Sequence, residues 1–366
     1  MKKDNSPFAS SRCTPPPPET GNRNPETESP ETERTWQGHH GPLLIAEVGG
    51  NHEGDFDYAL ELCDLAIGSG ADYVKYQLYT GDTLVSPVES PDRHRHFQRF
   101  ELTPEQHIAL AKRCRAAGVG YMASVWDPAM LGWIDKYLDI YKIGSGDLNA
   151  WPVIGEFARR GKPIILSTGL STLDEVLETV AFIQQTNPVY KQPENLALLQ
   201  CTAMYPIDNS DANLRAMDTL RERTGLATGY SDHTRGSLAL LIAAARGARV
   251  LEFHFTDQRE GKTFRDHKVS LTRDEVRSLC AQLDAMNDLL GDGEKSPLPC
   301  EINTGHVTSF RRALYTRRPL KAGETIQAKD LVALRPNHGI DARRYREVIG
   351  QRVKKDTAAY EAIELE

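Results

Sequence analysis

The chain has 366 residues, of which 39% are hydrophobic and 26% are charged, and its formal net charge is −7. These values are ordinary for a globular protein and predict either one large domain with a small one or two to three domains of average size. The acidic balance argues against a nucleic-acid partner, and no apolar run approaches the ~20 residues of a membrane span.

The first 40 residues differ in composition from the rest of the chain. The stretch from Ser6 to Glu33 consists mainly of Pro, Glu, Thr, Ser and Asn. Such a segment has little apolar surface to bury, so residues 1–40 are predicted to form a disordered tail. They also lack the apolar core of a secretory signal. The six cysteines show no paired spacing, which favours reduced thiols and predicts a cytoplasmic protein.

Short apolar runs then alternate with amphipathic segments of helix length. The predicted strands are residues 43–48, 72–77, 120–124, 140–143, 163–167, 196–201, 227–230 and 249–254. The predicted helices include residues 55–69, 104–117, 173–185 and 237–246. Apolar strands joined by helices indicate a buried parallel sheet. Eight such units predict an α/β fold, a (β/α)8 TIM barrel over residues 41–294. A doubly wound open sheet is the alternative, but no dinucleotide-type glycine pattern follows the first run.

Three segments fall outside this alternation. Residues 86–100, with His94 and His96, are predicted to be a solvated loop. Residues 295–308 are predicted to be a linker, because Lys295–Pro299 has a linker composition. Residues 309–366 contain short strand-like runs and turns and predict a small second domain. A domain of this size is marginal alone, so we expect it to dock onto another surface.

Polar residues at the predicted strand ends form a candidate anion site. The active site of a (β/α)8 barrel lies at the C-terminal ends of its strands. Ser145, Ser167 and Ser231 occupy glycine-flanked turns there, and Lys142 is close in sequence to the first of them. Hydroxyls and backbone N–H groups in such turns can bind an anion, and a lysine adds charge. The alternative is that these are ordinary turns.

A pair of histidines and several charged residues suggest further chemistry at the same end. His233 and His254 follow adjacent strands, as expected for a divalent first-row metal with open coordination positions. Hydrogen bonding is the alternative role for each. The carboxylates of Glu53, Glu252 and Asp266 are candidates for acid–base work. Two strand lysines leave a Schiff-base mechanism open, namely Lys75 and Lys142.

Several motifs, in one order along the chain, resemble the N-acetylneuraminate (sialic acid) synthase family. In the predicted barrel they are Ile45–Asp55, Val74–Gln77, Tyr141–Asp147, Lys162–Gly169, Gln200–Thr202, Tyr205–Pro206, Gly229–Thr234 and Glu252–Thr256. The C-terminal part is similar to the family's antifreeze-like (SAF, β-clip) domain through Arg312, Lys321–Glu324 and Leu334–Pro336. The resemblance runs from about Leu43 to the end of the chain.

The resemblance implies a reaction and a set of roles. Phosphoenolpyruvate condenses with the aldehyde of N-acetylmannosamine, a related amino sugar or its phosphate, and a nine-carbon 2-keto acid and phosphate result. Phosphoenolpyruvate is expected to bind Lys142, Ser145, Ser167 and Ser231. Mn²⁺ or Mg²⁺ is expected at His233 and His254. The other expected substrate contacts are Asn51, Tyr205 and Glu252, and the expected catalytic residues that contact the substrate are Lys75, Gln77 and Asp266. Glu53 is expected to handle the proton of the attacking water. Arg335 is expected to reach the sugar in a partner's site, in a domain-swapped homodimer.

Two positions depart from the family pattern. Ala203 stands where the family usually has Asn or Ser, and Arg265 precedes Asp266 where the family usually has Pro. These changes leave the sugar open, and the precursors of pseudaminic and legionaminic acids are alternatives. A Schiff-base aldolase and a non-catalytic sugar-binding protein are the other two function classes that the sequence leaves open.

Overall fold

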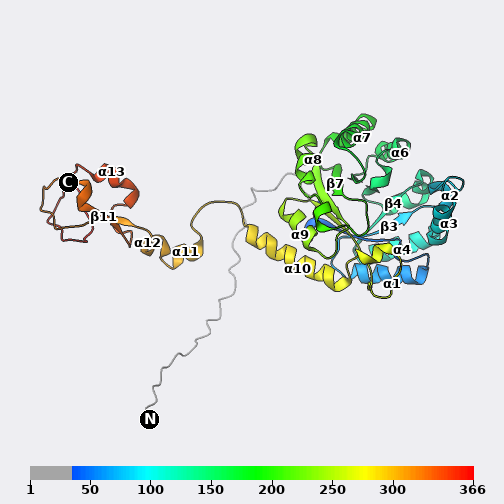
Figure 1. Ribbon diagram of the computed structural model, residues 1–366, viewed down its shortest axis with the longest axis horizontal. Coiled ribbons are helices and arrows are strands. Elements are labelled where there is room, and N and C mark those ends of the chain that lie inside the picture. Colours follow the sequence, from blue (N-terminus) through cyan, green and yellow to red (C-terminus); the bar gives the residue numbers. More distant parts are fainter. Residues whose placement is uncertain (1–34) are drawn as a thin grey trace, which may run out of the picture. The chain divides into compact units, whose positions relative to one another are not determined.

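Residues 35–366 are described by the computed structural model (Figure 1), and they divide into a first unit that ends at Leu289 and a second unit, Leu290–Glu366. Most of the predicted disordered tail therefore lies outside the described residues. The last six residues of that prediction are folded instead. Trp36 is only 3% exposed, and its indole N–H donates a 2.8 Å hydrogen bond to the carbonyl of Pro193. This large buried indole extends the first unit toward the N-terminus.

Eight parallel strands form the first unit. They are β2 (Gly41–Gly49), β3 (Tyr73–Leu78), β4 (Gly120–Val125), β5 (Tyr141–Ile143), β6 (Ile164–Ser167), β7 (Leu196–Cys201), β8 (Ala227–Asp232) and β9 (Val250–His254). Each pairs with the next, and β9 pairs back with β2, so the sheet closes. The two-residue strand β1 (Gln37–Gly38) adds to β2 in antiparallel fashion. The predicted (β/α)8 barrel is confirmed, and the open-sheet alternative is wrong.

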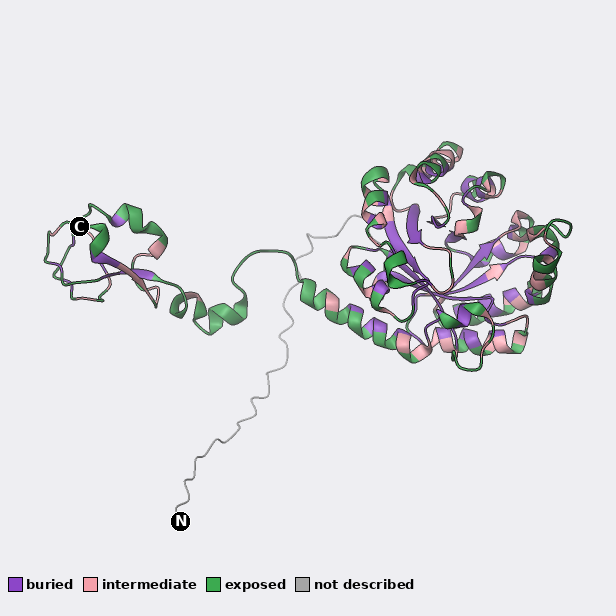
Figure 2. Cartoon of the chain, viewed as in Figure 1, coloured by how far each residue is buried: buried purple, intermediate pink, exposed green. Residues whose placement is uncertain are grey.

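Helices surround the strands. They are α1 (Phe56–Ile67), α2 (Gly81–Leu84), α3 (Pro91–Phe100), α4 (Pro104–Ala116), α5 (Leu131–Ile134), α6 (Trp151–Arg160), α7 (Leu173–Thr186), α8 (Ala216–Thr224), α9 (Leu238–Ala245) and α10 (Arg273–Leu290). Thr103 and Thr172 start α4 and α7 with capping boxes. The helices are buried toward the strands and exposed on the outside (Figure 2). Within residues 35–366, no helix combines the length and apolarity needed to cross a membrane.

The segment 86–100 is not the loop that we predicted, because its last 10 residues form helix α3. Phe100 is 2% exposed, and its ring lies 5.1 Å from that of Phe264 and 4.2 Å from that of His96. Apart from these contacts the helix is mostly charged and exposed. Only Phe97 and Phe100 are apolar side chains in its interior and last turn, which is too few for a recognisable helical period.

The second unit, described by itself, contains a small sheet and short helices. Its elements are α11 (Pro299–Asn303), α12 (His306–Ser309), β10 (Ala313–Thr316), β11 (Leu331–Leu334) and α13 (Tyr345–Val348). β10 and β11 pair antiparallel over a core that includes Leu314, Ile326 and Val353. The predicted linker thus includes α11 and most of α12.

Candidate active site

Alternation along the barrel strands determines which side chains reach the site. One set of alternate residues, including Leu43 and Ile45 on β2, forms a small apolar cluster with Met122, Ile165 and Val250. The other set packs against the helices. Because side chains in a strand alternate between two faces, the first set fills the barrel interior. The polar residues that continue it toward the C-terminal ends are Glu47, Lys75, Gln77, Ser124, Lys142, Ser167, Ser231, Glu252 and His254.

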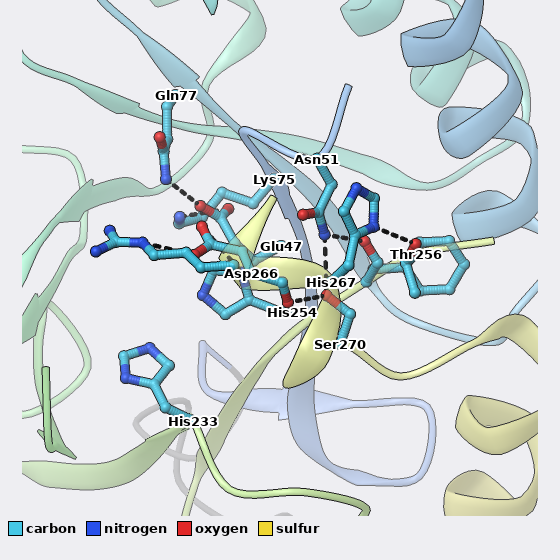
Figure 3. Close-up of polar contacts among 12 residues, drawn as sticks. Glu47, Asn51, Lys75, Gln77, His233, His254, Thr256, Asp266, His267 and Ser270 are labelled. Atoms are coloured by element: carbon cyan, nitrogen blue, oxygen red, sulfur yellow. Dashed lines mark hydrogen bonds and ion pairs between the residues drawn. The ribbon is translucent and has the colours of Figure 1, made fainter. Parts of the chain in front are cut away.

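Two buried lysines and two buried carboxylates meet in the centre of this layer, and Figure 3 shows one pair of them, Lys75 and Glu47. Lys75 Nζ lies 2.5 Å from Glu47 Oε2, and Gln77 Nε2 donates to Glu47 Oε1 at 2.9 Å. Glu252 lies between the lysines, 3.6 Å from Lys75 Nζ and 3.5 Å from Lys142 Nζ. The register explains the first contact, because Glu47 is level with Lys75 on the adjacent strand.

The charges of this cluster influence one another. Burial alone would lower the pKa of Lys75, but Glu252 and Glu47 outweigh it and raise that pKa above its ordinary value. Burial lowers the pKa of Lys142, against the attraction of Glu252, and the charge of Lys75 lowers it further. Burial would raise the pKa of Glu252, but the two lysines hold it below its usual value. Lys75 is therefore the firmly charged ammonium group of the pair.

The predicted anion-binding residues lie together beside this cluster. Lys142 Nζ donates to Ser167 Oγ at 2.7 Å, and a backbone N–H donates to Ser145 Oγ at 3.0 Å. Burial raises the pKa of the Cys201 thiol, and the hydroxyls of Ser145 and Ser231 act on it in the opposite direction. Both serines therefore lie beside Cys201. The arrangement offers three hydroxyls and an ammonium group to an anion.

The two predicted metal-binding histidines are neighbours. The ring centroids of His233 and His254 are 5.3 Å apart, and the ring of Tyr205 lies 4.0 Å and 5.4 Å from them. His233 Nδ1 donates to the carbonyl of Thr202 at 2.7 Å, which leaves its Nε2 lone pair free. His254 Nδ1 is buried without a hydrogen-bond partner, 4.0 Å from Asp266 Oδ2.

These observations fit two histidines that bind one metal ion. Burial, and then the neighbouring His254, lowers the pKa of His233 to about 3, so its imidazole is neutral at physiological pH, as metal binding requires. No group of three or more His, Cys, Asp or Glu residues with metal-binding geometry occurs in residues 35–366. An ion held by the two histidines would therefore take its other ligands from water or substrate.

Asp266 and Arg265 lie next to the histidine pair. Asp266 is 5% exposed, and Arg265 Nε donates to its Oδ1 at 3.1 Å. The Arg265 guanidinium lies 4.6 Å from the centroid of the Tyr205 ring. Arg335 belongs to the second unit, where its exposed guanidinium lies 5.6 Å from the ring of Phe310.

Asn51 and Glu53 make other contacts than the lysines do, and Figure 3 shows those of Asn51. The amide of Asn51 donates at 2.9 Å to the carbonyl of Phe255 and to Ser270 Oγ. Glu53 has a φ of 53°, its side chain is 37% exposed, and its carboxylate lies 3.5 Å from the imidazole of His267. Glu53 thus contacts a histidine and no lysine of the cluster. Asn51 joins the loop at Phe255 to the loop at Ser270.

Our assignment of roles from the sequence missed two carboxylates. Glu47 continues the inward alternation of β2, and that period was the signal that could have identified it. Asp147 ends the 3-10 helix η4 (Ser145–Asp147) beside the anion-binding residues, and burial raises its pKa to about 6. Glu47 is 2% exposed and contacts Lys75, so its buried carboxylate is a second candidate base in addition to Glu53.

Comparisons with known proteins agree with this geometry. Residues 62–295 match the NeuB family, and residues 311–364 match the SAF domain. The chain is 32% identical over 327 residues to the N,N'-diacetyllegionaminic acid synthase of Campylobacter jejuni, covering 86% of this chain and 96% of that one. It is 30% identical to the human N-acetylneuraminate-9-phosphate synthase, and the match covers 72% of this chain and 76% of that one. The crystal structure of the N-acetylneuraminic acid synthetase of Leptospira borgpetersenii superposes with a TM-score of 0.66 at 28% identity, covering 72% and 90%.

Proposed function

The chain belongs to the NeuB family, and from this premise we propose that it condenses phosphoenolpyruvate with the open-chain aldehyde of N-acetylmannosamine or a related amino sugar. It is a carbon–carbon bond-forming synthase. The products are a nine-carbon 2-keto acid and phosphate. One observation carries the proposal: two groups of residues meet at one end of a single barrel. One is the histidine pair, and the other is the lysine–serine cluster, which consists of Lys75, Lys142, Ser145, Ser167 and Ser231.

The lysine–serine cluster binds phosphoenolpyruvate in this proposal. Lys142 and the hydroxyls of Ser145, Ser167 and Ser231 donate hydrogen bonds to its anionic oxygens. Lys75 stays charged because Glu47 and Glu252 surround it, so it adds electrostatic attraction without needing to lose a proton. The short contacts within the cluster hold these groups in place before substrate arrives, which lowers the cost of reorganisation during the reaction.

The histidine pair and the carboxylate of Glu47 act on the two reacting carbons. His233 and His254 would hold Mn²⁺ or Mg²⁺, which supplies polarisation of the aldehyde oxygen when it is bound. Attack of the phosphoenolpyruvate methylene on the aldehyde leaves positive charge at the carbon that carries the phosphate. Glu47 faces that charge and accepts the proton of the water that adds there. Phosphate then leaves by C–O cleavage, and the 2-keto group forms.

A Schiff-base aldolase is the alternative on the same barrel. Lys75 is a poor nucleophile because two carboxylates keep it protonated. Lys142 has a lowered pKa, but its amine donates to Ser167 Oγ and to the carbonyl of Ile143. Covalent trapping with pyruvate and borohydride would identify such an amine, and we expect no trapped adduct at either lysine.

Phosphate release tests the proposed function. Phosphoenolpyruvate is incubated with a panel of N-acetylmannosamine, its 6-phosphate and the diacetamido sugars that precede legionaminic and pseudaminic acids, with and without manganese. We expect release only when both substrates and the metal are present, with ¹⁸O from the bridging position recovered in phosphate. The absence of release with every sugar in the panel contradicts the proposal.

We also propose that two chains share their sites as a domain-swapped homodimer, on the strength of the Arg335 motif. Arg335 is exposed and has no carboxylate partner in the described part of the chain, so it is free to donate to a sugar carbonyl. Mixing an Arg335→Ala chain with a Glu47→Gln chain, under conditions of subunit exchange, should restore about a quarter of wild-type activity. Half of the exchanged dimers are mixed, and one of the two sites in each is intact.

The control for this mixture replaces Arg343, an exposed arginine of the same unit that pairs with Asp341. An Arg343→Ala chain should be active by itself. If the first mixture stays inactive although exchange is demonstrated by mass spectrometry, each site is built from a single chain and the shared-site proposal is wrong.

A further inference from the structure

A cationic cavity lies outside the cluster that we assign to phosphoenolpyruvate, and the loops that line it follow the two strands at whose ends His233 and His254 lie. It has a volume of about 480 Å³ and is lined by Arg235, Gly236, Arg259, Lys268 and Glu275. Arg235 and Gly236 belong to the loop after β8, and Arg259 and Lys268 belong to the segment after β9. The cavity therefore lies between the loops that follow the seventh and eighth strands of the barrel.

The positive charge of this cavity is not balanced from within. Its carboxylate, Glu275, accepts hydrogen bonds from both terminal nitrogens of Arg259 at 2.6 Å and 2.7 Å. That contact, aided by others, lowers the pKa of Glu275 to about 2, so Glu275 and Arg259 neutralise each other. Arg235 and Lys268 are exposed and have no ion-pair partner among residues 35–366. Two cations in a concave surface attract an anion more strongly than isolated surface charges do.

Both loops that line the cavity also carry residues of the candidate active site. Arg235 follows His233 by two residues, so their Cα atoms are at most about 7 Å apart. Lys268 ends the 3-10 helix η7 (Arg265–Lys268), and side chains three residues apart in such a helix lie on the same side. Arg265, at the other end of η7, covers the ring of Tyr205. One end of η7 thus carries a cation at the ring next to the histidines, and its other end carries a cation that lines the cavity.

We propose that this cavity binds a phosphate monoester on the amino-sugar substrate, which makes an N-acetylhexosamine 6-phosphate the substrate class. The proposal rests on the proposed function, because it places the sugar aldehyde at the histidine pair. The 6-position of an open-chain hexosamine lies five carbon–carbon bonds from that aldehyde. Arginine and lysine are the residues that bind phosphate monoesters, and (β/α)8 barrels frequently bind phosphate between the loops after strands seven and eight.

The test compares two sugars that differ only by the phosphate, N-acetylmannosamine and its 6-phosphate. The wild-type chain should prefer the phosphorylated sugar. The double variant Arg235→Gln, Lys268→Gln should lose about 10- to 100-fold of that preference, measured as the ratio of the two kcat/KM values. The loss should shrink as ionic strength rises. The control is Lys112→Gln, which removes an exposed cation of α4 and should leave the ratio unchanged.

Two further measurements separate the possible failures. Inorganic phosphate is titrated as an inhibitor, and if the double variant changes only its inhibition and not the sugar ratio, the cavity binds free phosphate and the assignment to the sugar is overturned. Calorimetric titration of the 6-phosphate into the wild type and the double variant needs no turnover. Equal affinities overturn the subsite whatever reaction the enzyme performs. Turnover of the unphosphorylated sugar alone overturns the subsite but leaves the proposed condensation intact.

Discussion

Replacing His233 or His254 by alanine is expected to lower kcat by about 10²- to 10⁴-fold, which corresponds to the several kcal/mol that a metal ion supplies as a Lewis acid. The two imidazoles are buried neighbours 5.3 Å apart, and the pKa of His233 is lowered so far that the ring stays neutral. Removing either ring leaves one protein ligand, which is too few to retain a divalent ion at micromolar concentrations. The measurement is phosphate release at saturating manganese, together with calorimetric titration of manganese into each variant.

The fold must survive for this result to be informative. His254 is 5% exposed, so its truncation leaves a cavity, and a thermal unfolding curve is needed for each variant. His306→Ala provides the matched control, because this histidine is exposed in the second unit and should change neither activity nor manganese binding. Full turnover by the His233→Ala, His254→Ala double variant after chelation would show that the reaction needs no metal at this position.

Periodicity accounts for the fold that was predicted correctly and for the side chains that the structure brings together at the strand ends. Apolar runs with intervening amphipathic segments repeat eight times, and the closed barrel follows from that repeat. Residues inside a strand can be assigned to a face by counting in twos. Counting places Lys142 and Ser167 in the same layer, and the structure joins them with a 2.7 Å hydrogen bond.

Counting residues in twos fails where the strand ends. This explains why the positions of Glu47 and Glu53 in the motif Ile45–Asp55 are not equally predictable. The pairing of β2 with β3 shifts register between Glu47 and Gly49, and Gly49 has a φ of 55°. The chain then turns twice, through backbone hydrogen bonds from Asn51 to Val48 and from Glu53 to Gly50. Two turns after an irregular strand end cannot be derived from residue spacing. The predicted role of Glu53 came from the family resemblance, and its place in the structure depends on those turns, whereas the position of Glu47 depends on the regular part of β2.

Substitution of Glu47 is the second change with a large expected effect. Glu47→Gln should lower kcat by about 10²- to 10⁴-fold, the usual contribution of a general base, while phosphoenolpyruvate still binds. The substitution keeps the shape of the side chain and removes its charge, so the loss should appear mainly in kcat. It also removes one of the two carboxylates that raise the pKa of Lys75. The pKa of Lys75 should therefore fall, and phosphoenolpyruvate binding by the variant should weaken at a lower pH than in the wild type.

Glu53→Gln is the matched comparison, because it makes the same chemical change in the same motif. The Glu53 side chain is 37% exposed, and its carboxylate contacts the imidazole of His267 rather than a lysine of the cluster. We therefore expect Glu53→Gln to stay within about tenfold of wild-type kcat, which is about 1.4 kcal/mol of activation free energy. Single-turnover phosphate release, with phosphoenolpyruvate affinity measured separately, distinguishes a chemical defect from a binding defect in both variants. If Glu53→Gln shows the larger loss of kcat and Glu47→Gln turns over normally, Glu53 is the base, and the lysine-bound carboxylate only balances the charge of Lys75.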